Sequence, residues 1–179
     1  MTLKRFICLC LYYGIARWLP VSHSRWSFQI GKYVRRGLCR HIFKKMGRGV
    51  NIERGAFFGT GSEIEIGDRS GLGINCRIHP NTKIGCDVMM GPNCIMLEAD
   101  SHIYIRTDIS MIDQGKKPVS ERCQVVIEDD IWIGQDVMIL GSKIIKTGTI
   151  IGARCVLTKN FPDYSIVGGN PSRLIRNRK

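Results

Sequence analysis

The chain has 179 residues; 44% of them are hydrophobic, 20 are glycine and 6 are proline. This length allows one domain with a short extension, the apolar share excludes a disordered chain, and the lack of a Gly-X-Y period excludes collagen. The 27 lysines and arginines outnumber the 15 acidic residues by 12, which indicates a polyanion, an anionic membrane or an acidic small molecule as a partner.

The excess positive charge lies at the start of the chain. Residues 1–48 contain eleven lysines and arginines and no acidic residue, whereas the remaining residues carry 16 bases and 15 acids. Because the rest of the chain is nearly neutral, no nucleic-acid partner is expected. We expect residues 1–48 to form a basic helical extension that is broken at Pro20 and at glycines.

Two roles for this extension stay open. Its aromatic and aliphatic residues are mixed with bases, which is typical of an interfacial helix on an anionic membrane surface. Alternatively, it packs on the end of a repeat array as a cap. Its longest apolar run, from Phe6 to Ala16, is about half of the roughly 20 residues that a membrane-spanning helix needs, so no transmembrane helix is expected.

The eight cysteines predict free thiols. They show no CxxC pair and no paired spacing, and no cleavage site of a signal peptide is recognised. We therefore expect a cytoplasmic protein, which is peripheral on the inner face of the cytoplasmic membrane if residues 1–48 take the first of their two roles.

The middle of the chain repeats with a period of six residues. The large aliphatic residues that recur are Ile66, Leu72, Ile78, Ile84, Met90 and Met96, and then Ile127, Ile133, Ile139, Ile145, Ile151 and Leu157. Ile52, Phe58 and Ile64 form an imperfect first coil. This period fits a chain that turns a corner every six residues and closes a three-sided coil in 18. Single coils cannot bury their inward residues, so they must stack, and we predict a hexapeptide-repeat parallel β-helix over residues 49–160.

Two positions just after inward residues lead to specific expectations. Glycine often stands there, as at Gly67, Gly73, Gly85 and Gly91, which we interpret as corners that need unusual backbone dihedral angles. His79 follows Ile78 in the same way and is expected at the surface.

Residues 98–124 interrupt the repeat, because Met96 and Ile127 are 31 residues apart, which is not a multiple of six. This polar excursion loop contains His102, and a long loop on so regular a scaffold is typically functional. After residue 160 the period has ended, and residues 161–179 are expected to form a short C-terminal helix or tail.

The hexads resemble those of the left-handed β-helix acyltransferases. Residues 127–176 are similar to the C-terminal signature of the maltose, galactoside and xenobiotic acetyltransferase branch, through IEDDIWIG, IGARCVLTK and a GNP followed by bases. The stretch SHIYIRTDISMIDQG looks most like O-acetyltransferases of capsular and exopolysaccharide synthesis. The resemblance implies an all-β, left-handed parallel β-helix, a homotrimer, and active sites between prisms with acetyl-CoA along the coils.

The resemblance also implies catalytic residues. His102 matches the general base, which acyl transfer to a sugar hydroxyl needs because an alcohol near neutral pH is a poor nucleophile. Asn75 is similar to an asparagine near the acceptor hydroxyl. Either Glu98 or Asp100 is a candidate to orient the imidazole. The loop residues expected to contact the acceptor sugar are Asp100, Asp113 and Gln114.

A third set of residues is expected to bind coenzyme A. It comprises Trp132, Gly134, Ala153, Thr158, Lys159, Arg173 and Arg176. Small residues allow the thin pantetheine arm to lie flat on the coils, and the bases suit its phosphate groups.

The predicted function is therefore acetyl-CoA-dependent O-acetyl transfer to a sugar, by direct attack and without a metal. One alternative is a γ-type carbonic anhydrase, which uses the same spiral but needs three histidine ligands, whereas only His79 and His102 lie in the repeat. The other is a non-catalytic, membrane-tethered β-helix scaffold, against which the C-terminal signature and the loop histidine argue.

Overall fold

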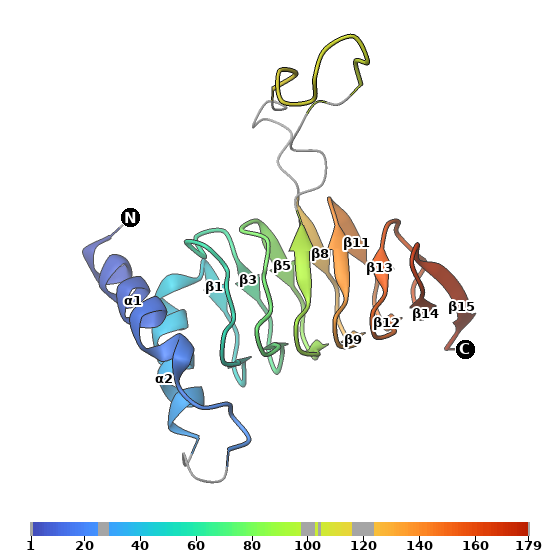
Figure 1. Ribbon diagram of the computed structural model, residues 1–179. Coiled ribbons are helices and arrows are strands. Elements are labelled where there is room, and N and C mark those ends of the chain that lie inside the picture. The colour runs from blue at the N-terminus through green and yellow to red at the C-terminus, as the bar shows by residue number, and fades with distance from the viewer. Residues whose placement is uncertain (1, 25–28, 98–102, 104, 116–123, 179) are drawn as a thin grey trace.

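The computed structural model describes residues 2–24, 29–97, 103, 105–115 and 124–178, and shows a three-sided prism of parallel strands with helices at one end (Figure 1). Face 1 contains β1 (Lys45–Met46), β3 (Glu65–Ile66), β5 (Thr82–Ile84), β8 (Val125–Ile127) and β11 (Lys143–Ile145). Face 2 contains β2 (Asn51–Ile52), β4 (Gly71–Leu72), β6 (Met89–Met90), β9 (Trp132–Ile133), β12 (Ile150–Ile151), β14 (Ser165–Gly168) and β15 (Arg173–Asn177). Face 3 contains β7 (Ile95–Leu97), β10 (Met138–Leu140) and β13 (Val156–Leu157).

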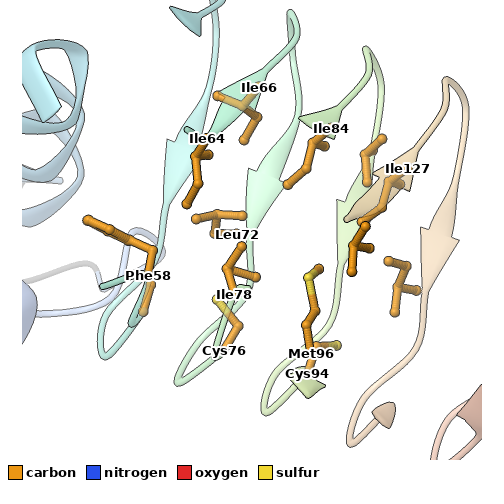
Figure 2. Close-up of a cluster of buried hydrophobic side chains, with 14 of the residues drawn as sticks. Phe58, Ile64, Ile66, Leu72, Cys76, Ile78, Ile84, Cys94, Met96 and Ile127 are labelled. Atoms are coloured by element: carbon orange, nitrogen blue, oxygen red, sulfur yellow. The ribbon is translucent and has the colours of Figure 1, made fainter. Parts of the chain in front are cut away.

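The six-residue period places one large side chain on each side inside the prism, as predicted. Ile66 pairs with Ile84, and Ile133 pairs with Ile151, in parallel register one coil apart. These four side chains are buried, and Figure 2 shows such inward residues stacked from coil to coil. Removing these rows of aliphatic surface from water is the main source of stability for a coil that has no core of its own.

The excursion loop returns the chain to the same register. Ile84 pairs with Ile127, although 43 residues separate them and a coil needs only 18. The loop leaves after β7 on face 3 and re-enters at β8 on face 1. It is therefore an insertion at the corner between these two faces, and the coils above and below it stay aligned.

The glycines that follow inward residues are not explained by unusual dihedral angles, so this prediction was wrong. Gly67, Gly73, Gly85 and Gly91 do not have positive φ angles. Glycine is needed because adjacent coils approach closely: a Cβ on Gly67 would lie 2.6 Å from the carbonyl carbon of Gly85. The unusual dihedral angles occur two residues later. The non-glycine residues with φ between 55 and 59° at these corners are Arg69, Asn75, Asp87, Asn93, Asp130, Asp136 and Arg154.

Helices close the N-terminal end of the prism (Figure 1). The first helix, α1 (Leu3–Gly14), begins at Thr2, whose hydroxyl accepts the Arg5 N–H. A 3-10 turn, η1 (Ala16–Trp18), follows it, and α2 (Ile30–Ile42) comes next in the described chain. No helix in these described segments is long and apolar enough to cross a bilayer.

Both helices pack on the first coil. Tyr12 is fully buried, its ring lies 4.6 Å from that of Phe58, and its hydroxyl donates to the Ala56 carbonyl at 2.9 Å. Cys39 and Ile42 of α2 are also fully buried. The helices therefore cap the repeat array, which is one of the two roles that the sequence left open.

The C-terminal segment differs from the expected helix or tail. Residues Arg173–Asn177 form β15, which pairs antiparallel with β14 and closes face 2. All five residues of β15 are exposed, so the alternation that marks a strand in the sequence is missing. The strand pairing also runs beyond the predicted boundaries of residues 49–160, because it starts at β1 and ends at β15.

Candidate active site

Trp132 stands on the outer surface of face 2. Its neighbour Ile133 points into the prism and is fully buried, so Trp132 points outward and 52% of it is exposed. In the pairing register Trp132 lies between Met89 and Ile150, and Ile150 pairs in turn with Ile166. The result is an apolar row on the outside of face 2.

Arg176 extends this row. It pairs with Ile166, so it lies three strands from Trp132 in the same sheet, or about 14 Å at the usual strand spacing. Both Arg173 and Arg176 are exposed. The next base, Arg178, is used structurally, since its Nη1 donates to Asp130 at 3.0 Å and to the Gly148 carbonyl at 2.7 Å.

A glycine edge runs beside the row, where the chain leaves face 2. Gly73, Gly91, Gly134 and Gly152 each follow an inward residue of this face. A Cβ on Gly134 would lie 2.6 Å from the amide nitrogen of Ala153, and one on Gly91 would lie 2.8 Å from that of Gln135. The edge is therefore free of side chains over successive coils, which suits a thin, extended ligand.

Thr158 and Lys159 lie just after β13 at the end of face 3. The Thr158 amide donates to the hydroxyl of Ser172 at 3.0 Å, which links this turn to the start of β15. The Lys159 ammonium lies 5.5 Å from the centre of the Phe161 ring and is exposed. Through Ser172, these two residues are close in the fold to Arg173.

Asn75 lies at the corner after face 2, two coils before Trp132. It is exposed, has a φ of 55°, and donates its backbone N–H to the Arg54 carbonyl at 2.9 Å. Asparagine adopts this left-handed conformation more readily than most residues do.

The loop candidates are described only in part. His102, Glu98 and Asp100 lie outside the described residues. The Gln114 amide accepts the Arg106 N–H at 3.0 Å and donates to the Arg106 carbonyl at 2.8 Å, so its polar atoms already hold the loop together. Asp113 accepts a hydrogen bond from Ser110 within the same loop.

The tip of this loop is unexpectedly apolar. Ile105 is 79% exposed, Met111 is 72% exposed and Ile112 is 88% exposed. Large apolar side chains that gather at an exposed surface are typical of an interaction site. The sequence reasoning missed them, as it missed Met89 and Ile150, because it followed the inward positions and the polar residues only.

The expectation for His79 was wrong, because this residue is buried, with 8% of it exposed. Its ring folds back on its own turn, where Nδ1 accepts the Asn81 N–H at 3.1 Å, and its carbonyl accepts the Thr82 hydroxyl at 2.6 Å. Among the residues that the structure describes, no three His, Cys, Asp or Glu side chains gather as a metal site.

A shallow groove lies elsewhere, on face 1. It has a volume of about 450 Å³ and is lined by charges of both signs, among them Lys45, Glu65, Lys83 and Glu128. None of the predicted site residues lines it.

The structure thus brings together Trp132, Gly134, Ala153 and Arg176 on face 2 and its edge, with Thr158, Lys159 and Arg173 at the adjacent C-terminal end. It does not bring the described residues of the excursion loop, 103 and 105–115, to them within one chain (Figure 1). The loop leaves the prism between faces 3 and 1, and in a three-sided prism face 2 is the side opposite to that corner.

Comparisons with known proteins agree with this fold. No family model matches the chain. A protein of Schizosaccharomyces pombe named as an acetyltransferase is 31% identical over 127 residues, 70% of this chain and 58% of its own. The galactoside O-acetyltransferase of Escherichia coli K12 is 27% identical over 144 residues, 79% of this chain and 68% of its own. The chain thus spans little more than half of the first relative.

The structural neighbours have the same architecture. A hexapeptide-repeat acetyltransferase of Vibrio cholerae, solved with acetyl coenzyme A, matches with a TM-score of 0.69 at 24% identity, over 98% of this chain and 87% of its own. Such neighbours are left-handed β-helix proteins, which confirms the predicted fold class.

Proposed function

We infer that this chain, a homologue of the galactoside and maltose O-acetyltransferases with their left-handed β-helix, transfers an acetyl group from acetyl-CoA to a sugar hydroxyl. The acceptor is a sugar used to synthesise a surface polysaccharide, and the transfer takes place in the cytoplasm. The observation that carries the proposal is the alignment of Trp132, the glycine edge and Arg176 along one face of the prism.

These residues suit coenzyme A along its whole length. The glycine edge at Gly134 and Gly152, with the small side chain of Ala153 beside it, accommodates the pantetheine arm, and Trp132 packs against it. Lys159, Arg173 and Arg176, at the C-terminal end of the prism, pair with the phosphates, for which exposed cations are the natural partners. Thr158 adds a polar contact at the same end.

His102 acts as the general base. It takes the proton of the acceptor hydroxyl while the oxygen attacks the thioester carbonyl, and the tetrahedral intermediate then collapses. The carbon–sulfur bond breaks, and the departing thiolate of coenzyme A receives the proton back from the imidazolium. Asn75 positions the acceptor, Asp100 and Asp113 bind its hydroxyls, and Gln114 shapes the loop beside them.

A homotrimer completes the site. Because face 2 lies opposite to the corner where the loop leaves, His102 of one chain meets the Trp132 row of its neighbour. The exposed loop residues Ile105, Met111 and Ile112 then find an apolar partner surface in that row. No metal takes part.

Two alternatives are less well supported. A γ-type carbonic anhydrase requires three histidine ligands, and His79, one of the two histidines of the repeat, is buried and hydrogen-bonded within its own turn. A non-catalytic scaffold requires neither a coenzyme A track nor a histidine loop.

The test is transfer of labelled acetyl from acetyl-CoA to a panel of sugars, nucleotide sugars and lipid-linked sugars. We expect His102→Ala to abolish transfer and leave coenzyme A binding, measured by calorimetry, unchanged. His23→Ala, at an exposed histidine far from the loop in sequence, is the control and should remain active. Full activity of the His102 variant would reject the role of this residue.

A further inference from the structure

The outward side of the cap carries a continuous apolar stripe. Along α1 and η1, exposed apolar side chains recur every three or four residues, as one face of a helix requires. They are Leu3, Phe6, Ile7, Leu11, Ile15 and Trp18, each between 44 and 75% exposed. The opposite side of the same helix, with Cys8 and Tyr12, is already buried against α2 and the first coil. The stripe is therefore a second surface, which no described part of this chain covers.

A basic hollow lies on the exposed side of α2. Tyr33, Arg36, Gly37 and Arg40 line a depression of about 270 Å³. The two arginines are one helical turn apart, and Gly37 leaves space between them. The Nε of Arg36 has no hydrogen-bond partner among the described residues. Two guanidinium groups beside an open hollow have the charge and the N–H donors that suit a phosphate group.

The charge of the cap excludes some partners. Residues 1–48 contain no acidic residue, so only acids from the prism can neutralise their bases. Glu53 lies beside Arg35 and Glu65 beside Lys44, whereas Lys4, Arg36 and Arg40 form no ion pair within the described part of the chain. A second copy of this cap would place like charges together, whereas an anionic bilayer offers both an apolar layer and phosphates.

We propose that the cap docks on an anionic membrane surface. The stripe of α1 and η1 lies in the boundary between acyl chains and headgroups, and the hollow between Arg36 and Arg40 holds a lipid phosphate. In a trimer of parallel prisms the three caps lie at one end, so all three face the same membrane. The docking does not depend on the acetyl-transfer chemistry and is tested without it.

The test is co-sedimentation of the full chain with vesicles of phosphatidylcholine alone or with about 30% phosphatidylserine. One double variant, Phe6→Ser with Leu11→Ser, removes part of the stripe. A second, Arg36→Gln with Arg40→Gln, removes the hollow. The matched control, Lys45→Gln with Arg48→Gln, removes two exposed bases from the same segment but outside the helices. Thermal melts confirm that each variant is folded.

We expect binding to anionic vesicles that weakens with salt, and little binding to neutral ones. Each helix variant should lower the partition coefficient roughly tenfold or more, and the control by less than about threefold. Three results would overturn the proposal: wild-type protein that stays in the supernatant, equal losses in both charge variants, or a stripe variant that changes the sedimentation coefficient of the lipid-free protein and leaves vesicle binding intact.

Discussion

The guanidinium of Arg35 is completely buried and lies 3.7 Å from the carboxylate of Glu53, so this pair joins α2 to the first coil. Arg35 Nε donates to the Ile52 carbonyl at 2.6 Å, and Nη1 donates to the carbonyls of Leu19 and Pro20 at 3.0 and 3.1 Å. One side chain thus connects three segments: the coil, α2 and the chain that follows η1.

Arg35→Met should therefore destabilise the protein strongly. The substitution leaves Glu53 without its cation and three carbonyls without a donor, which costs about 3–5 kcal/mol in comparable buried pairs. Urea unfolding measures the loss. Arg40→Met, at an exposed position of the same helix, should change the free energy of unfolding by less than about 0.5 kcal/mol. Equal effects of the two substitutions would show that Arg35 does not hold the cap in place.

Protonation of the Glu53 carboxylate should destabilise the protein in acid. Burial would raise the pKa of Glu53, but hydrogen bonds from Ser22 and Asn51 and the charge of Arg35 outweigh it and hold this pKa below the usual value of 4.5. A lowered folded-state pKa contributes stability above pH 4.5, and the contribution disappears as the pH falls through the folded-state pKa.

The measurement is the free energy of unfolding of wild type and Glu53→Gln at about pH 7 and about pH 3. We expect wild type to be clearly more stable than Glu53→Gln at the higher pH. The difference between their free energies of unfolding should be smaller at the lower pH. The same difference in free energy of unfolding at both pH values would contradict the assigned role of the Glu53 charge.

Gly134 tests the close contact between coils. Gly134→Ala would place a Cβ 2.6 Å from the amide nitrogen of Ala153, so the two coils must separate, at a cost of about 1–3 kcal/mol. The same methyl group obstructs the edge proposed for pantetheine, so coenzyme A affinity should fall as well. Gly14→Ala is the control, because no atom lies within 4 Å of a Cβ there. If Gly134→Ala keeps both stability and affinity, the edge is neither tight nor a binding track.

A substitution of Trp132 should weaken acetyl-CoA binding without affecting folding. Since half of this side chain is exposed, Trp132→Ala should leave the melting temperature nearly unchanged while the KM for acetyl-CoA rises roughly tenfold. Ile144→Ala, at an outward apolar position of face 1, is the matched control. A similar KM for both variants would show that acetyl-CoA does not bind along face 2.

Much of the fold is readable from the sequence, because a single rule repeats. The spacing of Ile66, Ile84 and Ile127 encodes which strands pair, since each coil must place its inward residue above the previous one. The C-terminal strand is not readable in this way, because its pairing with β14 is antiparallel and all its residues are exposed.

The positions of the candidate residues were predictable on the coils and less so elsewhere. Trp132 and Gly134 occupy fixed positions of the hexad, so their placement on face 2 and its edge follows from the repeat. His79 was wrongly expected at the surface. Its burial depends on the hydrogen bond from Asn81 within its own turn, which the position in the hexad does not reveal. The apolar loop tip at Ile112 lies outside any repeat, and only its exposure in the folded chain identifies it.

The shared site, in which the loop of one chain meets face 2 of another, is best examined by mixing two impaired variants. His102→Ala and Trp132→Ala chains are co-expressed, and acetyl transfer by the purified mixed trimers is measured at an acetyl-CoA concentration well below the KM, where the Trp132 variant alone is only about a tenth as active as wild type. If the site is shared, some interfaces regain both intact residues, and random assembly of equal amounts predicts about a quarter of wild-type activity. Mixtures no more active than the two variants alone, despite proven subunit exchange, would show that the site is not shared between chains.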